Sequence, residues 1–198
     1  VTLLIGRLGV DALASHHIAS NVGGITFMIP LALGMAATIR VGSNVGARAY
    51  SASRRSAFVA LGASGVFAVS VGAVLFVFRE SIASLYTTDP AVMKIASVLL
   101  VVVALYQLLD DTQITAIGAL RGYKDTRTPM FTAAFAYWVI GLPVGVMLGF
   151  GLGPAEAMGV MGFWVGLFVG LTFAALILIS RVAWLSSNSR RIDVYATE

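Results

Sequence analysis

The sequence predicts an all-α membrane protein whose helices cross the bilayer several times. Of its 198 residues 59% are apolar and only 11% are charged, and the charges cluster so that long apolar stretches remain between them. A soluble domain of this length usually carries about 25% charge. The chain contains no cysteine, which excludes a disulfide framework and a thiolate metal site.

Five apolar stretches are long enough to span a membrane, which takes about 20 helical residues. They cover about residues 17–45, 57–78, 91–120, 130–150 and 159–185. Residues 1–8 are expected to be the end of a further helix. Residues 186–198 are expected to form a polar tail.

Local signals support the individual spans. The first contains Pro30 near its middle and the fourth contains Pro143, and each proline should kink its helix because it removes a backbone hydrogen bond. Asp89 and Pro90 suit the N-cap and first position of the third span, and Pro129 suits the start of the fourth. Glycines recur at every fourth position in the last two spans, which predicts close helix packing or a sliding surface: Gly141, Gly145, Gly149 and Gly153, then Gly162, Gly166 and Gly170.

Basic residues predict the orientation of the chain in the membrane. Ten of the 13 Lys and Arg residues fall at one set of span ends, so the positive-inside rule makes that side cytoplasmic. The C-terminus is then cytoplasmic, and the loops at 11–17, 78–91 and 151–158 are outside. Because these basic residues flank apolar segments and form no patch with interleaved aromatics, no nucleic-acid partner is expected.

An adjacent acidic pair, Asp110 and Asp111, lies deep in the third span. A charged side chain at the bilayer centre costs about 2.5–3.5 kcal/mol on insertion scales, so such groups usually handle ions, protons or polar substrates. Helical spacing places Tyr106, Asp110 and Gln113 on one face, where their oxygens could accept a proton or help bind a small hard cation. Asp111 lies on an adjacent face, where it either shares this role or only bonds between helices.

Other polar residues near the span ends leave two interpretations open. His16 and His17 begin the first full span, where they either respond to pH or only form interfacial hydrogen bonds. Asp89 is either a helix cap or an acidic group at the mouth of an outward cavity. No nucleophile elbow, phosphate-binding loop or HExxH motif occurs, so an enzyme is not expected.

Several segments, in order along nearly the whole chain, resemble the C-terminal half of NorM-type multidrug and toxic compound extrusion (MATE) transporters. The run Leu-Arg-Gly-Tyr-Lys-Asp ending at Asp125 is the most specific of them. The similar segments are Phe27–Leu31, Ile39–Gly42, Arg79–Tyr86, Leu105–Gln113, Gly118–Arg127, Tyr137–Pro143 and Gly162–Leu167.

The resemblance implies a twelve-helix fold of two six-helix lobes. Residues 1–8 would then end helix 7, and residues 9–185 would form helices 8–12 of the C-terminal lobe. Since the chain starts inside an apolar stretch, it is expected to be a fragment whose N-terminal lobe, with an acidic residue of helix 7, is missing. The complete protein is expected to be a monomer.

The resemblance also implies roles for individual residues. Asp110 matches the family's cation-binding aspartate and would hold Na+ in a sodium-coupled member, with Tyr106 one turn earlier. His16 matches a family histidine, and His17 stands where NorM-like members carry a glutamine that faces the drug cavity. Asp89 falls where some members have a cavity-lining aspartate. Asp111 and Gln113 remain candidates for the same cation or drug cavity.

The expected function is therefore export of cationic or amphiphilic drugs across a bacterial inner membrane, in exchange for Na+ or H+ and without a cofactor. The partners are membrane lipid, small-molecule drugs and the N-terminal lobe. One alternative is a flippase for a lipid-linked precursor, which would need a cationic cavity where this chain buries acidic groups. A membrane-embedded enzyme would need a catalytic partner for the acidic pair, and the sequence offers none. A non-transporting membrane subunit is the remaining alternative.

Overall fold

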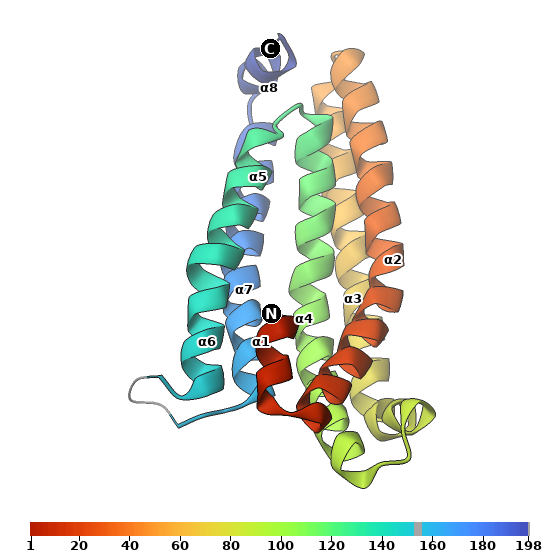
Figure 1. Ribbon diagram of the computed structural model, residues 1–198. Helices are drawn as coiled ribbons and strands as arrows, with labels where there is room; N and C mark the ends of the chain where they lie inside the picture. Colours follow the sequence, from red (N-terminus) through yellow and green to blue (C-terminus); the bar gives the residue numbers. More distant parts are fainter. Residues whose placement is uncertain (153–155, 198) are drawn as a thin grey trace.

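The computed structural model describes residues 1–152 and 156–197, and its described part is built from helices joined by short turns (Figure 1). The elements in order are α1 (Thr2–Ile5), a 3-10 turn (Gly6–Leu8), α2 (Val10–Gly46), α3 (Tyr50–Tyr86), α4 (Pro90–Gly122), α5 (Arg127–Ala134), the π-helical segment η2 (Phe135–Gly141), α6 (Leu142–Phe150), α7 (Val160–Ser186) and α8 (Ser189–Thr197).

Five helical stretches of the described chain are long and apolar enough to cross a membrane. They are α2, α3, α4, the continuous stretch Arg127–Phe150 made of α5, η2 and α6, and α7. Consecutive stretches run in opposite directions along the bundle, so the short helix α8 lies at the end where α2 and α4 finish (Figure 1). The prediction of an all-α polytopic membrane protein is therefore confirmed.

The helices extend beyond the apolar stretches, and the prediction of a loop at residues 11–17 is wrong. Gly9 has φ of 113°, and α2 begins immediately after it, so these residues form its first turns. Helix α3 likewise continues to Tyr86 into the second expected loop, and only Ala47–Ala49 separate it from α2. Hydropathy marks where the lipid ends, whereas the helix continues because its backbone groups still bond within it and long charged side chains can reach water.

The fourth stretch changes its helical pitch before Pro143. Residues 135–141 form η2, and Pro143 is the second residue of α6. Proline cannot donate a backbone hydrogen bond, so the carbonyl group one turn before it loses its usual partner. A π-helical segment is one way in which a helix accommodates this change in its hydrogen bonding. Pro30 lies inside α2, whose helix runs through it.

Glycines bring two helix pairs into backbone contact. A Cβ added to Gly118 of α4 would lie 2.1 Å from the carbonyl oxygen of Gly34 in α2. Between α6 and α7, a Cβ on Gly166 would lie 2.3 Å from the backbone nitrogen of Gly145. The glycine repeats of the last two spans thus face each other, as the packing interpretation predicts, while Gly153 lies outside the described residues.

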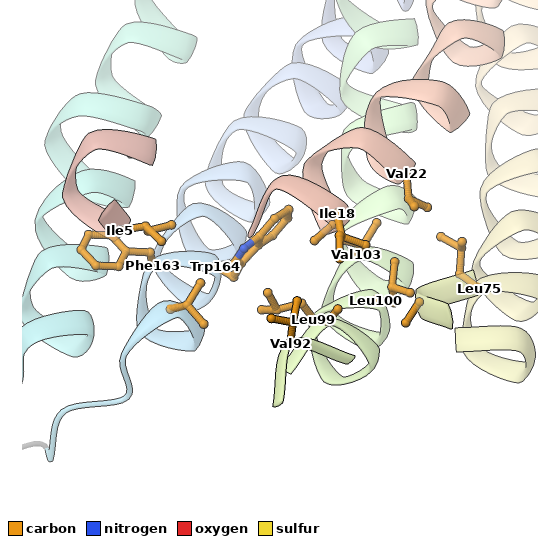
Figure 2. Packing of buried hydrophobic residues seen from close by; sticks show 14 residues of the cluster. Ile5, Ile18, Val22, Leu75, Val92, Leu99, Leu100, Val103, Phe163 and Trp164 are labelled. Carbon is orange, nitrogen blue, oxygen red and sulfur yellow. The ribbon is translucent and has the colours of Figure 1, made fainter. Parts of the chain in front are cut away.

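Two apolar clusters fill the bundle. One lies toward the end where α2 begins, and Figure 2 shows Ile18, Leu99 and Trp164 converging there from α2, α4 and α7. The other lies at the opposite end and includes Val41, Leu120 and Leu178. Ile192 of α8 is fully buried in this second cluster, which fixes α8 to the bundle.

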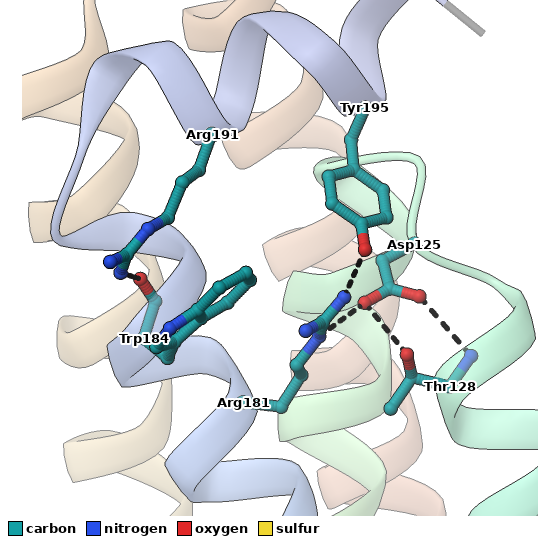
Figure 3. Close-up of polar contacts among 6 residues, drawn as sticks. All are labelled: Asp125, Thr128, Arg181, Trp184, Arg191 and Tyr195. Atoms are coloured by element: carbon teal, nitrogen blue, oxygen red, sulfur yellow. Dashed lines mark hydrogen bonds and ion pairs between the residues drawn. The ribbon is translucent and has the colours of Figure 1, made fainter.

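A polar network fastens the same end of the bundle (Figure 3). Asp125, which is 2% exposed, accepts hydrogen bonds from the Thr128 backbone and hydroxyl at 3.1 and 3.0 Å and from Arg181 Nε at 2.8 Å. The Arg181 guanidinium also donates to the Tyr195 hydroxyl and lies 4.5 Å from the centre of the Trp184 ring. The ion pair joins the α4–α5 turn to α7, and the hydrogen bond to Tyr195 extends the network to α8.

Candidate functional site

The structure separates the two acidic residues by environment. Asp111 is fully buried between helices, whereas Asp110 is half-buried and lines a cavity. No hydrogen-bond donor contacts the Asp110 carboxylate within the part of the chain that the structure describes. Asp110 is thus the carboxylate that a ligand in the cavity can reach.

Asp111 is held in a polar chain that links α4 to two neighbouring helices. Its Oδ1 accepts a hydrogen bond from Gln107 Nε2 at 2.6 Å, and Gln107 Oε1 accepts one from the Thr26 hydroxyl of α2 at 2.9 Å. Its backbone carbonyl accepts from the Ser64 hydroxyl of α3 at 2.8 Å. The other carboxylate oxygen, Oδ2, is buried without a partner among the described residues.

The cavity beside Asp110 has a volume of about 280 Å³ and lies between α2, α4 and α7. Its walls are mainly apolar and aromatic, and Asp110 is its only carboxylate among the described residues. The lining residues are His16, Ser20, Gly23, Gly24, Phe27, Val103, Tyr106, Gln107, Asp110, Trp164 and Leu167. An acidic group surrounded by aromatic rings suits a cation, since ring faces attract positive charge.

Gln113 lies beside Tyr106 and Asp110 on α4, but it does not line the cavity. Its side-chain oxygen accepts a hydrogen bond from the Tyr137 hydroxyl at 3.2 Å. Tyr137 belongs to η2, and its hydroxyl also interacts with that of Tyr106. The residue spacing within α4 could not predict this contact, because the position of Tyr137 depends on the π-helical turn of another span.

The two histidines lie in different environments. His16 is 6% exposed and lines the cavity, and its Nε2 lies 3.1 Å from the Thr2 hydroxyl while Nδ1 has no partner among the described residues. His17 is exposed and does not line the cavity. The two rings lie 5.9 Å apart, yet only His16 is placed to meet a ligand there.

Asp89 acts as a helix cap. Its Oδ1 accepts hydrogen bonds from the Ala91 and Val92 backbone at 2.8 and 3.4 Å, and it does not line the Asp110 cavity. These bonds satisfy amides at the start of α4 that have no partner within the helix.

Trp164 is a site residue that sequence reasoning missed. Its ring lies 5.8 Å from His16 and 5.9 Å from Tyr106, edge to face in both cases, and it forms part of the cavity wall. Its Nε1 is buried without a hydrogen-bond partner among the described residues. The available signal was helical phase: Trp164 is two residues from both Gly162 and Gly166, so it lies on the opposite face of α7 from the glycines that pack against α6.

Within the described residues, no three His, Cys, Asp or Glu side chains gather closely enough to hold a metal ion. Among the described residues, Asp110 is the one carboxylate of the cavity lining, so these residues would offer a cation there one carboxylate and neutral oxygen atoms.

Comparison with known proteins identifies the family and supports the fold. The MatE family model matches residues 1–147. The chain belongs to the MatE family. It is 45% identical over 198 residues to multidrug resistance protein MdtK of Proteus mirabilis, an alignment that covers all of this chain and 43% of that protein. It is 48% identical over 183 residues to multidrug resistance protein PmpM of Pseudomonas aeruginosa, which covers 92% of this chain and 38% of PmpM.

Solved MATE structures share the fold. The eukaryotic MATE transporter AtDTX14 matches with a TM-score of 0.86 at 24% identity, over 98% of this MatE chain and 43% of AtDTX14. The bent form of the Vibrio cholerae MATE transporter VcmN matches with a TM-score of 0.83 at 19% identity, over 98% and 42%. The chain thus spans about two fifths of the length of its relatives and forms part of one lobe of the twelve-helix fold.

Proposed function

We propose that the protein to which this chain contributes is a multidrug efflux antiporter that exports cationic or amphiphilic drugs in exchange for Na+ or H+. The names of the relatives support multidrug export. The observation that supports the coupling mechanism is the environment of Asp110. Its carboxylate has no hydrogen-bond donor among the described residues and faces an aromatic-walled cavity inside the bundle.

The chemistry follows from the charge of this carboxylate. An ionised Asp110 attracts either a small coupling cation or the positive group of a drug, while Tyr106 and Trp164 offer ring edges and faces to the drug's apolar part. A proton or Na+ that binds Asp110 neutralises it and removes the attraction for the drug. Differential binding of this kind can drive alternation between inward-open and outward-open states.

The remaining site residues take supporting roles in this proposal. Tyr137 and Gln113 hold the Tyr106 hydroxyl near Asp110, and His16 contributes to the cavity wall. Asp111 links helices and does not face the ligand, since its carboxylate is fully buried against Gln107.

The proposed orientation places the end that contains α8 in the cytoplasm of a bacterial cell, with the helices crossing the inner membrane. The helix ends and turns at that end of the bundle carry most of the basic residues, and the positive-inside rule favours this arrangement. Cysteine-accessibility labelling of Ser189→Cys and Asp89→Cys would test it: Ser189→Cys should react only after the inner membrane is permeabilised, and the opposite pattern contradicts the orientation.

The functional test is efflux of a fluorescent organic cation from cells that express full-length Asp110→Asn protein. The amide is nearly isosteric with the carboxylate but cannot ionise, so a proton gradient or a sodium pulse should no longer drive export. Asp89→Asn is the matched control, because Asp89 is exposed, caps α4 and does not line the cavity. Normal coupled export by Asp110→Asn would exclude the coupling role.

A further inference from the structure

A second cavity lies at the α8 end of the bundle and shares no lining residue with the Asp110 cavity. It has a volume of about 490 Å³ and lies where α2 ends, α3 begins and α4 ends. Three cations line it, Arg48, Arg121 and Lys124, together with the carboxylate of Asp193 from α8. The proposed drug site does not explain this concentration of positive charge.

Two of these cations occupy an unusual backbone position. Arg48 and Lys124 have φ of 55° and 64°, in the left-handed region that favours glycine. After α2, the Ala49 amide bonds the Asn44 carbonyl at 2.8 Å and the Arg48 amide bonds the Val45 carbonyl at 3.0 Å.

The same pattern ends α4. The Asp125 and Lys124 amides bond the Leu120 and Arg121 carbonyls, each at 2.9 Å. Both helices therefore end in a Schellman motif, whose left-handed position is usually glycine. In this chain that position holds a cation at both ends, and both cations line one cavity.

Two of the three lining cations, Arg48 and Arg121, form no ion pair with a described carboxylate. Asp193, the one carboxylate of the described lining, also accepts a hydrogen bond from the Tyr50 hydroxyl. By contrast, Arg181 near the same end is paired with Asp125 at 2.8 Å. Arg48 and Arg121 carry like charges on one cavity, so they repel each other unless an anion binds between them.

We propose that this cavity binds the phosphate group of an anionic ligand. Arginine forks suit phosphate oxygens, and basic pockets at helix ends on the cytoplasmic side of membrane proteins hold anionic lipid headgroups. On the α2 side the cavity is lined by Gly42 and by Val45, a member of the second apolar cluster, and this side suits the glycerol part of a lipid. A phospholipid headgroup and free phosphate share this chemistry, and the experiment distinguishes them.

The experiment uses full-length protein in phosphatidylcholine nanodiscs. Short-chain phosphatidylglycerol and inorganic phosphate are titrated separately at constant ionic strength, and bound ligand is counted by native mass spectrometry. The double substitution Arg48→Gln and Arg121→Gln should weaken phosphatidylglycerol binding about 25-fold, or about fivefold for each basic residue at a membrane surface. The charge-preserving pair Arg48→Lys and Arg121→Lys, which checks that the cavity still forms, should stay within about threefold of the parent protein.

The matched control is the double substitution Arg127→Gln and Arg190→Gln. It removes the same charge near the same end of the bundle from two exposed residues that do not line the cavity. If the control weakens phosphatidylglycerol binding equally, the effect is due to general surface charge and the proposal is overturned.

Comparing the two ligands shows whether the bound phosphate group belongs to a lipid or to a free anion. Binding of phosphatidylglycerol without competition from phosphate identifies a lipid site, and saturation by phosphate alone identifies a site for the free anion. Binding of neither overturns the proposal. Because transport is not the readout, these outcomes do not depend on whether Asp110 couples drug export.

Discussion

The contact between Gly118 and Gly34 gives a sharp prediction for the fold. In Gly118→Ala, the new Cβ would lie 2.1 Å from the Gly34 carbonyl oxygen and 2.6 Å from its carbonyl carbon. Since non-bonded carbon contacts normally lie at about 3.5–4.0 Å, α2 and α4 must move apart by roughly 1 Å or more. Both contacting groups are backbone, so no side-chain rotation relieves the clash.

The cost has two parts. Overpacking of this kind costs about 1–3 kcal/mol. The separation also stretches the bond from the Thr38 hydroxyl to the Gly118 carbonyl, which is 2.8 Å long and contributes about 1 kcal/mol. Alanine is favoured over glycine in a helix by about 0.5–1 kcal/mol, which leaves a net loss of about 1–3.5 kcal/mol. Relatives of full length are more than twice as long as this chain, so each kcal/mol should lower the melting temperature of full-length protein by about 1 °C, a fall of about 1–3 °C in all.

The assay is thermal unfolding of purified full-length protein in one detergent, followed by the fraction that remains monodisperse after heating. Gly62→Ala is the control, because Gly62 lies in α3 and a Cβ there meets nothing within 4 Å. Alanine inside a helix is favoured over glycine by about 0.5–1 kcal/mol, so this variant should melt at the same temperature or slightly higher. If Gly118→Ala melts together with Gly62→Ala, the close α2–α4 packing is refuted.

Three further substitutions test other parts of the structure. Asp125→Asn should destabilise the protein by about 3 kcal/mol, because it leaves the Arg181 guanidinium without its carboxylate. Trypsin should then cleave faster within α8, and an unchanged cleavage rate would contradict the network. Trp164→Phe removes a buried N–H that has no partner among the described residues, a gain of about 1 kcal/mol, but it also removes ring atoms packed in the apolar cluster. The melting temperature should therefore stay close to that of the parent protein, and a fall equivalent to more than about 3 kcal/mol would contradict an unpartnered Nε1. Asp111→Asn keeps an acceptor for Gln107 and should retain coupled efflux, whereas a folded variant without efflux would make Asp111 part of the coupling site.

The fold class was predictable because the bilayer constrains sequence strongly. A membrane requires long apolar helices, so the length and position of the apolar stretches revealed the five spans. The helix ends were harder to place: the turns beyond residue 78 of α3 and before residue 17 of α2 are helical without being apolar. The Schellman ends at Arg48 and Lys124 were also hidden, because the usual signal for such an end is glycine.

The candidate site was predictable where its geometry is local to one helix. The spacing of α4 placed Tyr106, Asp110 and Gln113 near one another, and the same helical phase explains why Asp111 points elsewhere. Trp164 and Tyr137 were missed because their positions depend on how α7 and η2 pack against α4. The helical repeat of a sequence predicts which residues share a face of one helix, but it does not predict which residues of different helices come into contact.

The central claim is that a coupling cation and a cationic drug compete for the carboxylate of Asp110. Its most direct measurement is equilibrium binding of a fluorescent organic cation to purified full-length protein, with and without Na+ and across pH, for the parent protein and for Asp110→Asn. We predict that Na+ or protons weaken dye binding to the parent protein, whereas binding to Asp110→Asn is weaker from the outset and insensitive to both. Equal competition in the two proteins would show that the coupling cation binds elsewhere.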